Sequence, residues 1–145
     1  MKRFKSLAII GSRGMVGSDL GRYLTSYFEN TSQIDRENYD RYRGKGFDVV
    51  INANGNSNKV WADKHVLSDF AESVTSTYES LFDFPCKTYV YISSADVYDN
   101  HTSEKFTSES ESINPENLSA YGLHKYLSEC IVRNLKKEHV ILRCP

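Results

Sequence analysis

Apolar positions along this chain follow two different spacings. Short runs rich in β-branched and aromatic residues, each bounded by Gly, Asn, Ser or Pro, predict strands at 6–10, 48–53, 88–93 and 139–144. Between them, apolar residues recur every three or four positions over 16–27, from about 64 to 84, and over 120–135, which is the pattern of helices with one buried face. Strands that are apolar along most of their length and alternate with such helices predict an α/β fold, a doubly wound parallel sheet.

The segment 31–46 carries the weakest pattern. Gln33 and Ile34 are its only strand-like residues, so we expect a short strand near Ser32 to Asp35. The polar, Tyr- and Arg-rich stretch that follows predicts no more than one helical turn. At the start of the last helix, Ser119 is the expected N-cap.

Composition narrows the class of protein. A chain of 145 residues is near the usual size of one domain, and its 18 basic and 19 acidic residues leave a net charge of −1. The chain thus has no excess of positive charge that would favour binding to nucleic acid or to an anionic membrane. With no apolar run near the ~20 residues that span a bilayer and no signal-peptide pattern, we expect a cytoplasmic protein without a membrane partner.

The cysteines and histidines show no metal-ligand spacing. The 3 cysteines are odd in number and lack a CxxC pair, which argues against both a disulfide framework and a zinc site. We expect them to be ordinary, mostly buried thiols, and we expect no metal.

The first strand runs directly into a glycine-rich turn, Gly11-Ser-Arg-Gly14-Met-Val-Gly17, and then into a helix. Glycines in this position allow backbone N–H groups and the helix N-terminus to approach a pyrophosphate closely. A tight turn without any ligand would use the same residues. The context between an apolar strand and an amphipathic helix favours nucleotide binding.

A second group of residues points to proton-transfer chemistry. Tyr121 and Lys125 are four residues apart, which places both on one face of the last helix. A nearby cation lowers the pKa of a phenol and makes it a better base. Ser93 and Ser94 follow directly on the strand segment Thr88 to Ile92, at its carboxyl end, where ligands bind in parallel sheets. A hydroxyl there can hydrogen-bond a substrate oxygen. Taken alone, the Tyr-Lys pair could equally be surface decoration, and the serines could simply end a strand.

Together these motifs resemble the extended branch of the short-chain dehydrogenase/reductase superfamily, the NAD-dependent epimerases, dehydratases and reductases that modify nucleotide sugars. The resemblance covers nearly the whole chain and rests on five segments: GSRGMVG at 11–17, DVVINANG at 48–55, YISSADVY at 91–98, SAYGLHKYLSE at 119–129 and ILRCP at 141–145. It implies a Rossmann-like domain that binds NAD or NADP, and a nucleotide-sugar substrate.

The resemblance also implies roles for individual residues. Tyr121 would be the acid/base that moves a proton at the sugar oxygen, Ser94 would orient that oxygen, and Lys125 would hold the cofactor ribose and lower the Tyr121 pKa. The residues expected to contact the cofactor are Gly11, Arg13, Gly14, Met15, Val16, Gly17, Asp35, Asn52, Ala53, Asn54, Gly55, Ser93, Tyr121 and Lys125. The helix from about 64 to 84 and the Tyr-Lys helix would form a homodimer interface, although burial against the sheet explains the same apolar stripe.

Departures from the family pattern leave several points open. The span from Phe28 to Asp48 is too short for two β-α units, so we expect one unit fewer than usual, and Asp35 could end the second strand or belong to the third. In the first case Asp35 would take the adenosine ribose; otherwise Arg13 and Arg36 are close enough to serve the 2′-phosphate of NADP. Ala95 and Asp96 follow Ser94 where dehydratases carry an acidic pair, which favours epimerisation or carbonyl reduction over dehydration.

The last departure concerns the substrate domain. Family members continue past the LRxP strand into a smaller domain that holds the nucleotide sugar, whereas this sequence stops at Pro145. We therefore expect residues 1–145 to be the NAD(P)-binding domain with the substrate domain absent. Two hypotheses follow: the core of an oxidoreductase or epimerase, in fragment or whole, or a dinucleotide-binding sensor or regulatory module without turnover.

Overall fold

One parallel sheet organises the molecule. The structure, a computed structural model, describes residues 4–145. Its 5-stranded sheet has the order β2-β1-β3-β4-β5, and every neighbouring pair is parallel. The strands are β1 (Ser6–Ile10), β2 (Asn30–Ile34), β3 (Phe47–Asn52), β4 (Cys86–Ser94) and β5 (His139–Cys144). These positions confirm the expected doubly wound fold, and the weakly patterned strand near residue 32 is present as β2.

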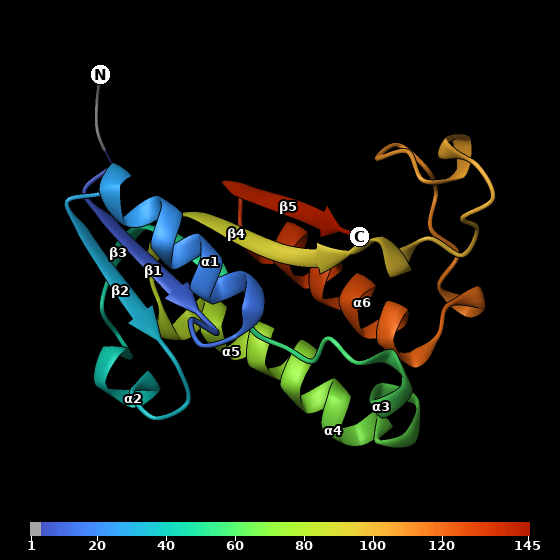
Figure 1. Ribbon diagram of the computed structural model, residues 1–145, viewed down its shortest axis with the longest axis horizontal. Coiled ribbons are helices and arrows are strands. Elements are labelled where there is room, and N and C mark those ends of the chain that lie inside the picture. Colours follow the sequence, from blue (N-terminus) through green and yellow to red (C-terminus); the bar gives the residue numbers. More distant parts are fainter. Residues whose placement is uncertain (1–3) are drawn as a thin grey trace.

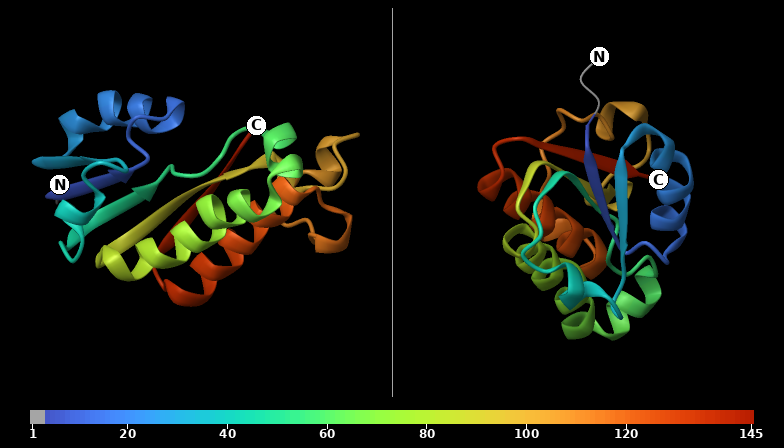
Figure 2. Two further views of the ribbon diagram at one scale, coloured as in Figure 1. Left: turned by 90° about the horizontal axis from the view of Figure 1, so that it is seen from below. Right: turned by 90° about the vertical axis from the view of Figure 1, so that its left-hand side faces the viewer.

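Helices cover both faces of the sheet (Figures 1 and 2). One face is covered by α1 and the other by α4, α5 and α6. The helices are α1 (Met15–Leu24), α2 (Tyr39–Tyr42), α3 (Lys59–Lys64), α4 (Val66–Phe70), α5 (Ser76–Asp83) and α6 (Ala120–Leu135). A π-helical segment, Ala71–Thr75, joins α4 to α5, so the helix expected from 64 to 84 is a continuous helical run from 66 to 83.

The strand order creates the place for a ligand. From β1 the chain goes to β2 on one side, and from β2 it crosses to β3 on the other side of β1. In open α/β sheets, ligands bind outside the carboxyl ends of the strands where the order reverses in this way. Only the single turn α2 lies between β2 and β3, which confirms that the chain has one β-α unit fewer than usual.

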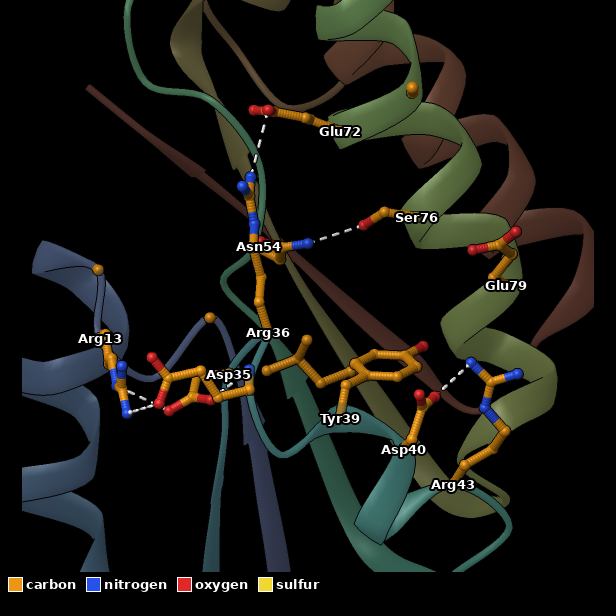
Figure 3. A pocket seen from close by; sticks show the side chains of 15 residues that line it. Arg13, Asp35, Arg36, Tyr39, Asp40, Arg43, Asn54, Glu72, Ser76 and Glu79 are labelled. Atoms are coloured by element: carbon orange, nitrogen blue, oxygen red, sulfur yellow. Dashed lines mark hydrogen bonds and ion pairs between the residues drawn. The ribbon is translucent and has the colours of Figure 1, made fainter.

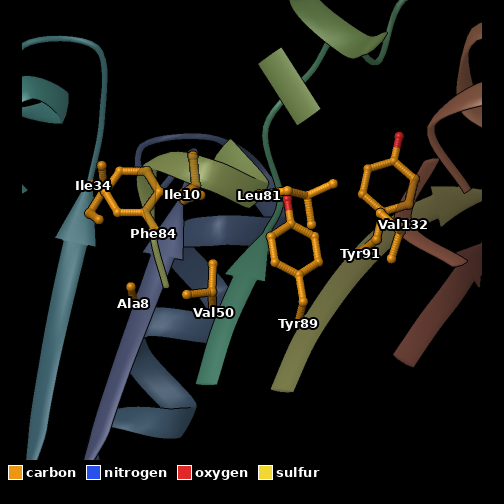
Figure 4. Close-up of a cluster of buried hydrophobic side chains, with 9 residues drawn as sticks. All are labelled: Ala8, Ile10, Ile34, Val50, Leu81, Phe84, Tyr89, Tyr91 and Val132. Carbon is orange, nitrogen blue, oxygen red and sulfur yellow. The ribbon is translucent and has the colours of Figure 1, made fainter. Parts of the chain in front are cut away.

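Two apolar clusters, one on each face, hold the sheet between its helices. The first lies beneath α5 and α6 (Figure 4) and contains Ala8, Ile10, Ile34, Val50, Leu81, Phe84, Tyr89, Tyr91 and Val132. The second lies beneath α1 and contains Leu7, Ile9, Val49, Ile51 and Ile92. Successive residues of β1 alternate between the two clusters because side chains of a strand point to opposite faces. Each strand of the centre is therefore apolar on both faces, as its sequence predicted.

The cysteines are less buried than expected. Cys86 and Cys144 are partly exposed and Cys130 is exposed, so the expectation of mostly buried thiols is wrong. Cys130 lies on the outward side of α6, and Cys144 lies at the end of an edge strand. Within residues 4–145, no helix is long and apolar enough to cross a membrane.

Candidate active site

The glycine turn brings α1 close to the end of β1. Gly11 has a φ of +79°, and a Cβ on it would lie 2.8 Å from the Ala53 carbonyl oxygen. A Cβ on Gly17 would lie 2.2 Å from the Gly11 carbonyl oxygen, so only glycine allows this approach. Gly14 caps α1 without any side-chain hydrogen bond, and the first turn of the helix has no acidic residue. The N–H groups there are available to an anion such as a pyrophosphate. Met15 at the start of α1 is exposed, whereas Val16 packs into the second apolar cluster.

Asp35 follows the second strand and not the third. Ile34 pairs with Ile10 in the register of β1 and β2, and the Gly11 N–H donates to the Ile34 carbonyl over 2.9 Å. The Asp35 carboxylate accepts the backbone N–H groups of Glu37 and Asn38 and pairs with the Arg13 guanidinium at 2.7 Å. The structure thus settles the open assignment of Asp35 and places it beside the glycine turn.

A cleft of about 820 Å³ opens between the glycine turn, the end of β2 and the helical run from 66 to 83 (Figure 3). Its charged lining consists of Arg13, Asp35, Arg36, Glu37, Asp40, Arg43, Glu72 and Glu79. Each arginine is paired with an acid of the same lining: Arg13 with Asp35 and Glu37, Arg36 with Glu72, and Arg43 with Asp40. Carboxylates therefore outnumber guanidinium groups in the cleft.

The loop after β3 connects this cleft to the Tyr-Lys helix. Asn54 lines the cleft and donates from its side chain to the Ser76 hydroxyl over 2.8 Å. Gly55, with a φ of +119°, comes so close to α6 that a Cβ on it would lie 3.5 Å from Lys125 Nζ. Asn52 is fully buried, and its amide donates to the hydroxyls of Thr77 and Tyr89. Asn52 thus anchors the loop, Ala53 donates its N–H to the Ile10 carbonyl, and Asn54 and Gly55 face outward.

Ser94, Tyr121 and Lys125 meet at the carboxyl end of β4. A Cβ on Gly122 would lie 2.3 Å from the Asp96 carbonyl oxygen, so glycine allows α6 to dock on the turn Ala95–Val97 and brings Tyr121 to Ser94. Ser119 caps α6, as expected, by accepting the Gly122 N–H. Ser94 Oγ donates to the Asp96 carboxylate over 3.0 Å, and that carboxylate also pairs with Lys59.

Burial governs the ionisation of the tyrosine and the lysine. Tyr121 is 7% exposed and Lys125 is 6% exposed. Burial raises the pKa of Tyr121, an effect that its hydrogen bond with Ser94 partly offsets. Burial lowers the pKa of Lys125, whose Nζ donates to the Ile92 carbonyl at 3.5 Å and lies 5.8 Å from the centre of the Tyr121 ring. In the chain alone the phenol is therefore held in its neutral form, and the lowered Tyr121 pKa that the resemblance implies requires further positive charge at the site.

A buried ion network lies directly behind these residues. The Glu129 carboxylate is fully buried and accepts hydrogen bonds from Ser93, Arg133 and Arg143. Arg143 also donates to the Tyr98 hydroxyl over 2.8 Å. The network joins α6 to the ends of β4 and β5. The Ser93 hydroxyl is part of it, because it donates to the buried Glu129 carboxylate. Sequence reasoning did not identify it, although Glu129 lies four residues after Lys125 on the same helical face and Arg143 lies in the LRxP segment.

A family comparison agrees with this geometry. The family described as the NAD dependent epimerase/dehydratase family matches residues 7–145. The chain belongs to this family. Membership confirms the resemblance inferred from the motifs and, because the family is NAD-dependent, the class of cofactor. Among curated proteins there is no match.

Several solved structures with the same fold are reductases or epimerases. A dTDP-4-dehydrorhamnose reductase from Bacillus anthracis, in complex with NADP, has a TM-score of 0.78 at 18% identity over 97% of this chain and 53% of its own. A UDP-glucuronic acid 4-epimerase from Bacillus cereus, in complex with UDP-glucuronic acid and NAD, has a TM-score of 0.76 at 18% identity over 95% of this chain and 55% of its own. A UDP-Glc/GlcNAc 4-epimerase from Campylobacter jejuni has a TM-score of 0.80 at 16% identity over 96% of this chain and 53% of its own. The present chain thus spans about half the length of these enzymes.

Proposed function

We propose that this chain is the NAD(P)-binding core of an oxidoreductase or epimerase that acts on a nucleotide-activated sugar. The observation that carries the proposal is the meeting of Ser94, Tyr121 and Lys125 at the carboxyl end of β4, with the Lys125 ammonium beside Gly55 and the cleft beyond it. A hydroxyl, a phenol and an ammonium group grouped in this way suit proton transfer at a substrate oxygen.

The residues of the cleft fit a dinucleotide. The glycine turn leaves space where side chains would stand, and the N-terminus of α1 offers N–H groups to the pyrophosphate. Asp35 lines the same cleft and would accept ribose hydroxyls. Arg13, Gly14 and Asn54 line the same cleft. Lys125 would hold the nicotinamide ribose from the other side of Gly55. Asn52, Ala53, Gly17 and Ser93 would act by shaping the backbone, because their side chains or Cβ positions face the interior of the fold.

A bound nicotinamide would supply or accept the hydride. Tyr121 would give a proton to the substrate oxygen or take one from it, and Ser94 would hold that oxygen in place. Lys125 would keep the phenol oriented and favour its anion. Ala95 stands where a dehydratase carries the first acid of its pair, so the proposal covers epimerisation or carbonyl reduction and not dehydration.

We further infer a preference for NAD over NADP. A 2′-phosphate brings roughly −1.5 to −2 charges into a cleft whose arginines are already paired and whose carboxylates are in excess. Asp35, 13% exposed at its side chain, would repel that phosphate and accept a ribose hydroxyl instead.

Calorimetric titration of NAD and NADP tests the proposal with one variant and one control. A Cβ on Gly14 would lie 3.3 Å from the Gly11 carbonyl oxygen, so Gly14→Val requires a small shift of the turn and would fill the space for the pyrophosphate. A thermal melt of the variant checks that it is folded. Gly46→Val is the control, because a Cβ there meets only the Pro85 oxygen at 3.7 Å, outside the cleft. We expect wild type and Gly46→Val to bind NAD more tightly than NADP, and Gly14→Val to bind at least ~10-fold more weakly. Equal binding by all three proteins would contradict the proposal.

The rival function, a regulatory module that binds the dinucleotide without turnover, predicts the same titration. Retention of Ser94, Tyr121 and Lys125 together favours the enzyme. Turnover by the chain, or by a longer protein that contains it, separates the two.

A further inference from the structure

Asp69 is a buried carboxylate that the proposed chemistry does not use. It lies in α4 with none of its surface exposed. Its Oδ2 atom lies 2.5 Å from Nδ1 of His124, and its Oδ1 atom accepts a hydrogen bond of 2.9 Å from the side-chain amide of Asn56. His124 is 55 residues away in the sequence and Asn56 is 13 away. One side chain thus joins three segments. Removing a carboxylate from water costs free energy, so a buried carboxylate is tolerated where its oxygens are paired, as they are here.

Each partner of Asp69 belongs to one half of the candidate site. His124 immediately precedes Lys125 on α6 and is 4% exposed, with its ring packed edge-on against Phe70 at 5.3 Å. Asn56 directly follows Gly55, on which a Cβ would lie 3.5 Å from Lys125 Nζ. Asn56 also closes this loop on itself, because it donates to the Asn58 carbonyl and accepts the Asn58 N–H, each at 2.8 Å.

We propose that Asp69 is a positioning residue that fixes the helix carrying Tyr121 and Lys125 relative to the loop that runs along the cofactor. The inference rests on the proposed function in one respect, since that loop is assigned to the cofactor there. In the ribbon, α4 runs beside the first turns of α6 while the loop passes from β3 to α3 next to both (Figures 1 and 2). His124 and Asn56 bind the two oxygens of the Asp69 carboxylate, so the hydrogen-bonded connection between the helix and the loop passes through Asp69.

The negative charge of Asp69 also supports the role proposed for it. It raises the pKa of Lys125 and so opposes the effect of burial on that ammonium. A carboxylate that holds both the position and the charge of Lys125 would keep the group ready for ribose hydroxyls. Asp69 itself would touch neither cofactor nor substrate.

Amide hydrogen exchange on the cofactor-free chain tests the coupling directly. In His124→Ala, we expect the amides of residues 54–58 to exchange at least ~10-fold faster, because the loop would lose its connection to α6 through Asp69. Ser128→Ala is the matched control: Ser128 is also buried on α6, and it donates to the carbonyls of His124 and Ser73 but not to Asp69. We expect this control to leave the loop unchanged. His124→Asn, whose amide can replace the Nδ1 donor, should restore the slow exchange.

Titration of NAD supplies the second readout. We expect His124→Ala to weaken binding ~10-fold and His124→Asn to weaken it much less. If wild type binds neither NAD nor NADP, the proposed function fails, while the exchange experiment still decides on the coupling. If wild type binds and His124→Ala changes neither affinity nor loop exchange, the positioning role is wrong.

A second variant, in the loop after β3, keeps the coupling testable if His124→Ala does not fold. Asn56 is only partly buried, so Asn56→Ala removes a partner of Asp69 at lower cost to the fold. We expect the amides of His124 and Lys125 to exchange faster in this variant than in wild type. Faster exchange spread evenly over the sheet, in either variant, would indicate a general loss of stability and overturn the proposal.

Discussion

Tyr121 and Lys125 lie in one buried environment that disfavours the charged form of each. Burial raises the pKa of the phenol and lowers the pKa of the ammonium. In the cofactor-free chain, burial therefore disfavours the phenolate of Tyr121 and the ammonium of Lys125. Both are the forms that the proposed chemistry uses, and further charge and hydroxyl groups that enter the site would favour them. Residues of this kind are expected to cost stability and to be retained for chemistry.

Replacement of Tyr121 by Phe isolates the proton-transfer role. The variant keeps the ring but loses the hydroxyl that interacts with Ser94. General acid–base catalysis contributes ~100- to 10,000-fold, so turnover by the active form of the protein should fall by at least the lower figure. Cofactor affinity should stay within ~2-fold of wild type, because the ring packing is unchanged. Rate assays at saturating cofactor, paired with calorimetry, measure both; a variant that keeps most of its rate would contradict the assigned role.

Replacement of Lys125 by Met separates function from stability. Because the pKa of Lys125 is lowered in the folded chain, the unfolded chain binds more protons between that value and the ordinary lysine pKa. Wild-type stability should accordingly rise as pH increases through this window, and the Met variant should lack the rise. At neutral pH we expect Lys125→Met to melt higher, by ~2–4 °C for each kcal/mol of relief, and to bind NAD more weakly. Thermal melts over a pH series test this; a lower melting temperature for the variant at neutral pH would refute it.

At the scale of elements, the positions of the strands and their parallel arrangement were largely predictable from the sequence. The central strands are apolar on both faces, and the Ser119 cap depends on neighbouring residues alone. Contacts between distant segments were not predictable in this way. Glu129 and Arg143 lie on α6 and β5, and nothing local to either shows that they pair. Tyr23 fits the apolar pattern of the first helix but is 76% exposed.

Asp35 shows the same limit at the site. The glycine turn, the strand-end serines and the Tyr-Lys pair were found in the sequence because each motif lies within one segment. Whether Asp35 ends the second strand or enters the third depends on the pairing of β2 with β1, which only the structure supplies. The positioning contacts of Asp69 went unnoticed for the same reason, since they cross three segments.

Two helical glycines offer a matched test of the docking of α6. Alanine favours a helix over glycine by up to ~1 kcal/mol. At Gly21 of α1, a Cβ would meet the flexible end of Gln33 at 3.2 Å, so Gly21→Ala should be neutral or stabilising. At Gly122 the Cβ would lie 2.3 Å from a backbone oxygen, so Gly122→Ala should destabilise the chain and move Tyr121 away from Ser94. Denaturant unfolding of both variants measures the difference; an equal effect of the two substitutions would show that α6 docks less tightly than its geometry implies.

At the scale of the whole molecule, the helical run from 66 to 83 leaves an apolar stripe uncovered. Its exposed members are Val66, Leu67, Phe70, Tyr78 and Phe82. We propose that this stripe, with the adjacent outer side of α6, forms the interface of a homodimer, which is the partner expected from the sequence. Leu67, at 88% exposed, contributes nothing to the fold of a single chain.

Sedimentation analysis tests the dimer. We expect wild type to sediment as a dimer at ~micromolar concentration and Leu67→Lys with Phe82→Lys to sediment as a folded monomer. Tyr23→Lys is the control, because Tyr23 is 76% exposed on α1, which covers the opposite face of the sheet. A monomeric wild type, or dissociation by the control alone, would rule out this interface.

The parallel arrangement of the sheet also sets the order in which the two parts of the candidate site, the glycine turn and the Tyr-Lys helix, are synthesised. Within the described residues, neighbouring strands form no hairpin: β1 pairs Leu7 with Val49, and β4 pairs Tyr89 with His139. A ribosome adds ~5–20 residues each second, so β1, β2 and β3 emerge well before α6 and β5. The glycine turn and Asp35 can therefore assemble in a nascent chain that does not yet contain Tyr121. The proton transfer proposed for Tyr121 would then become possible only when α6 docks on β4 and β5, after the glycine turn has formed.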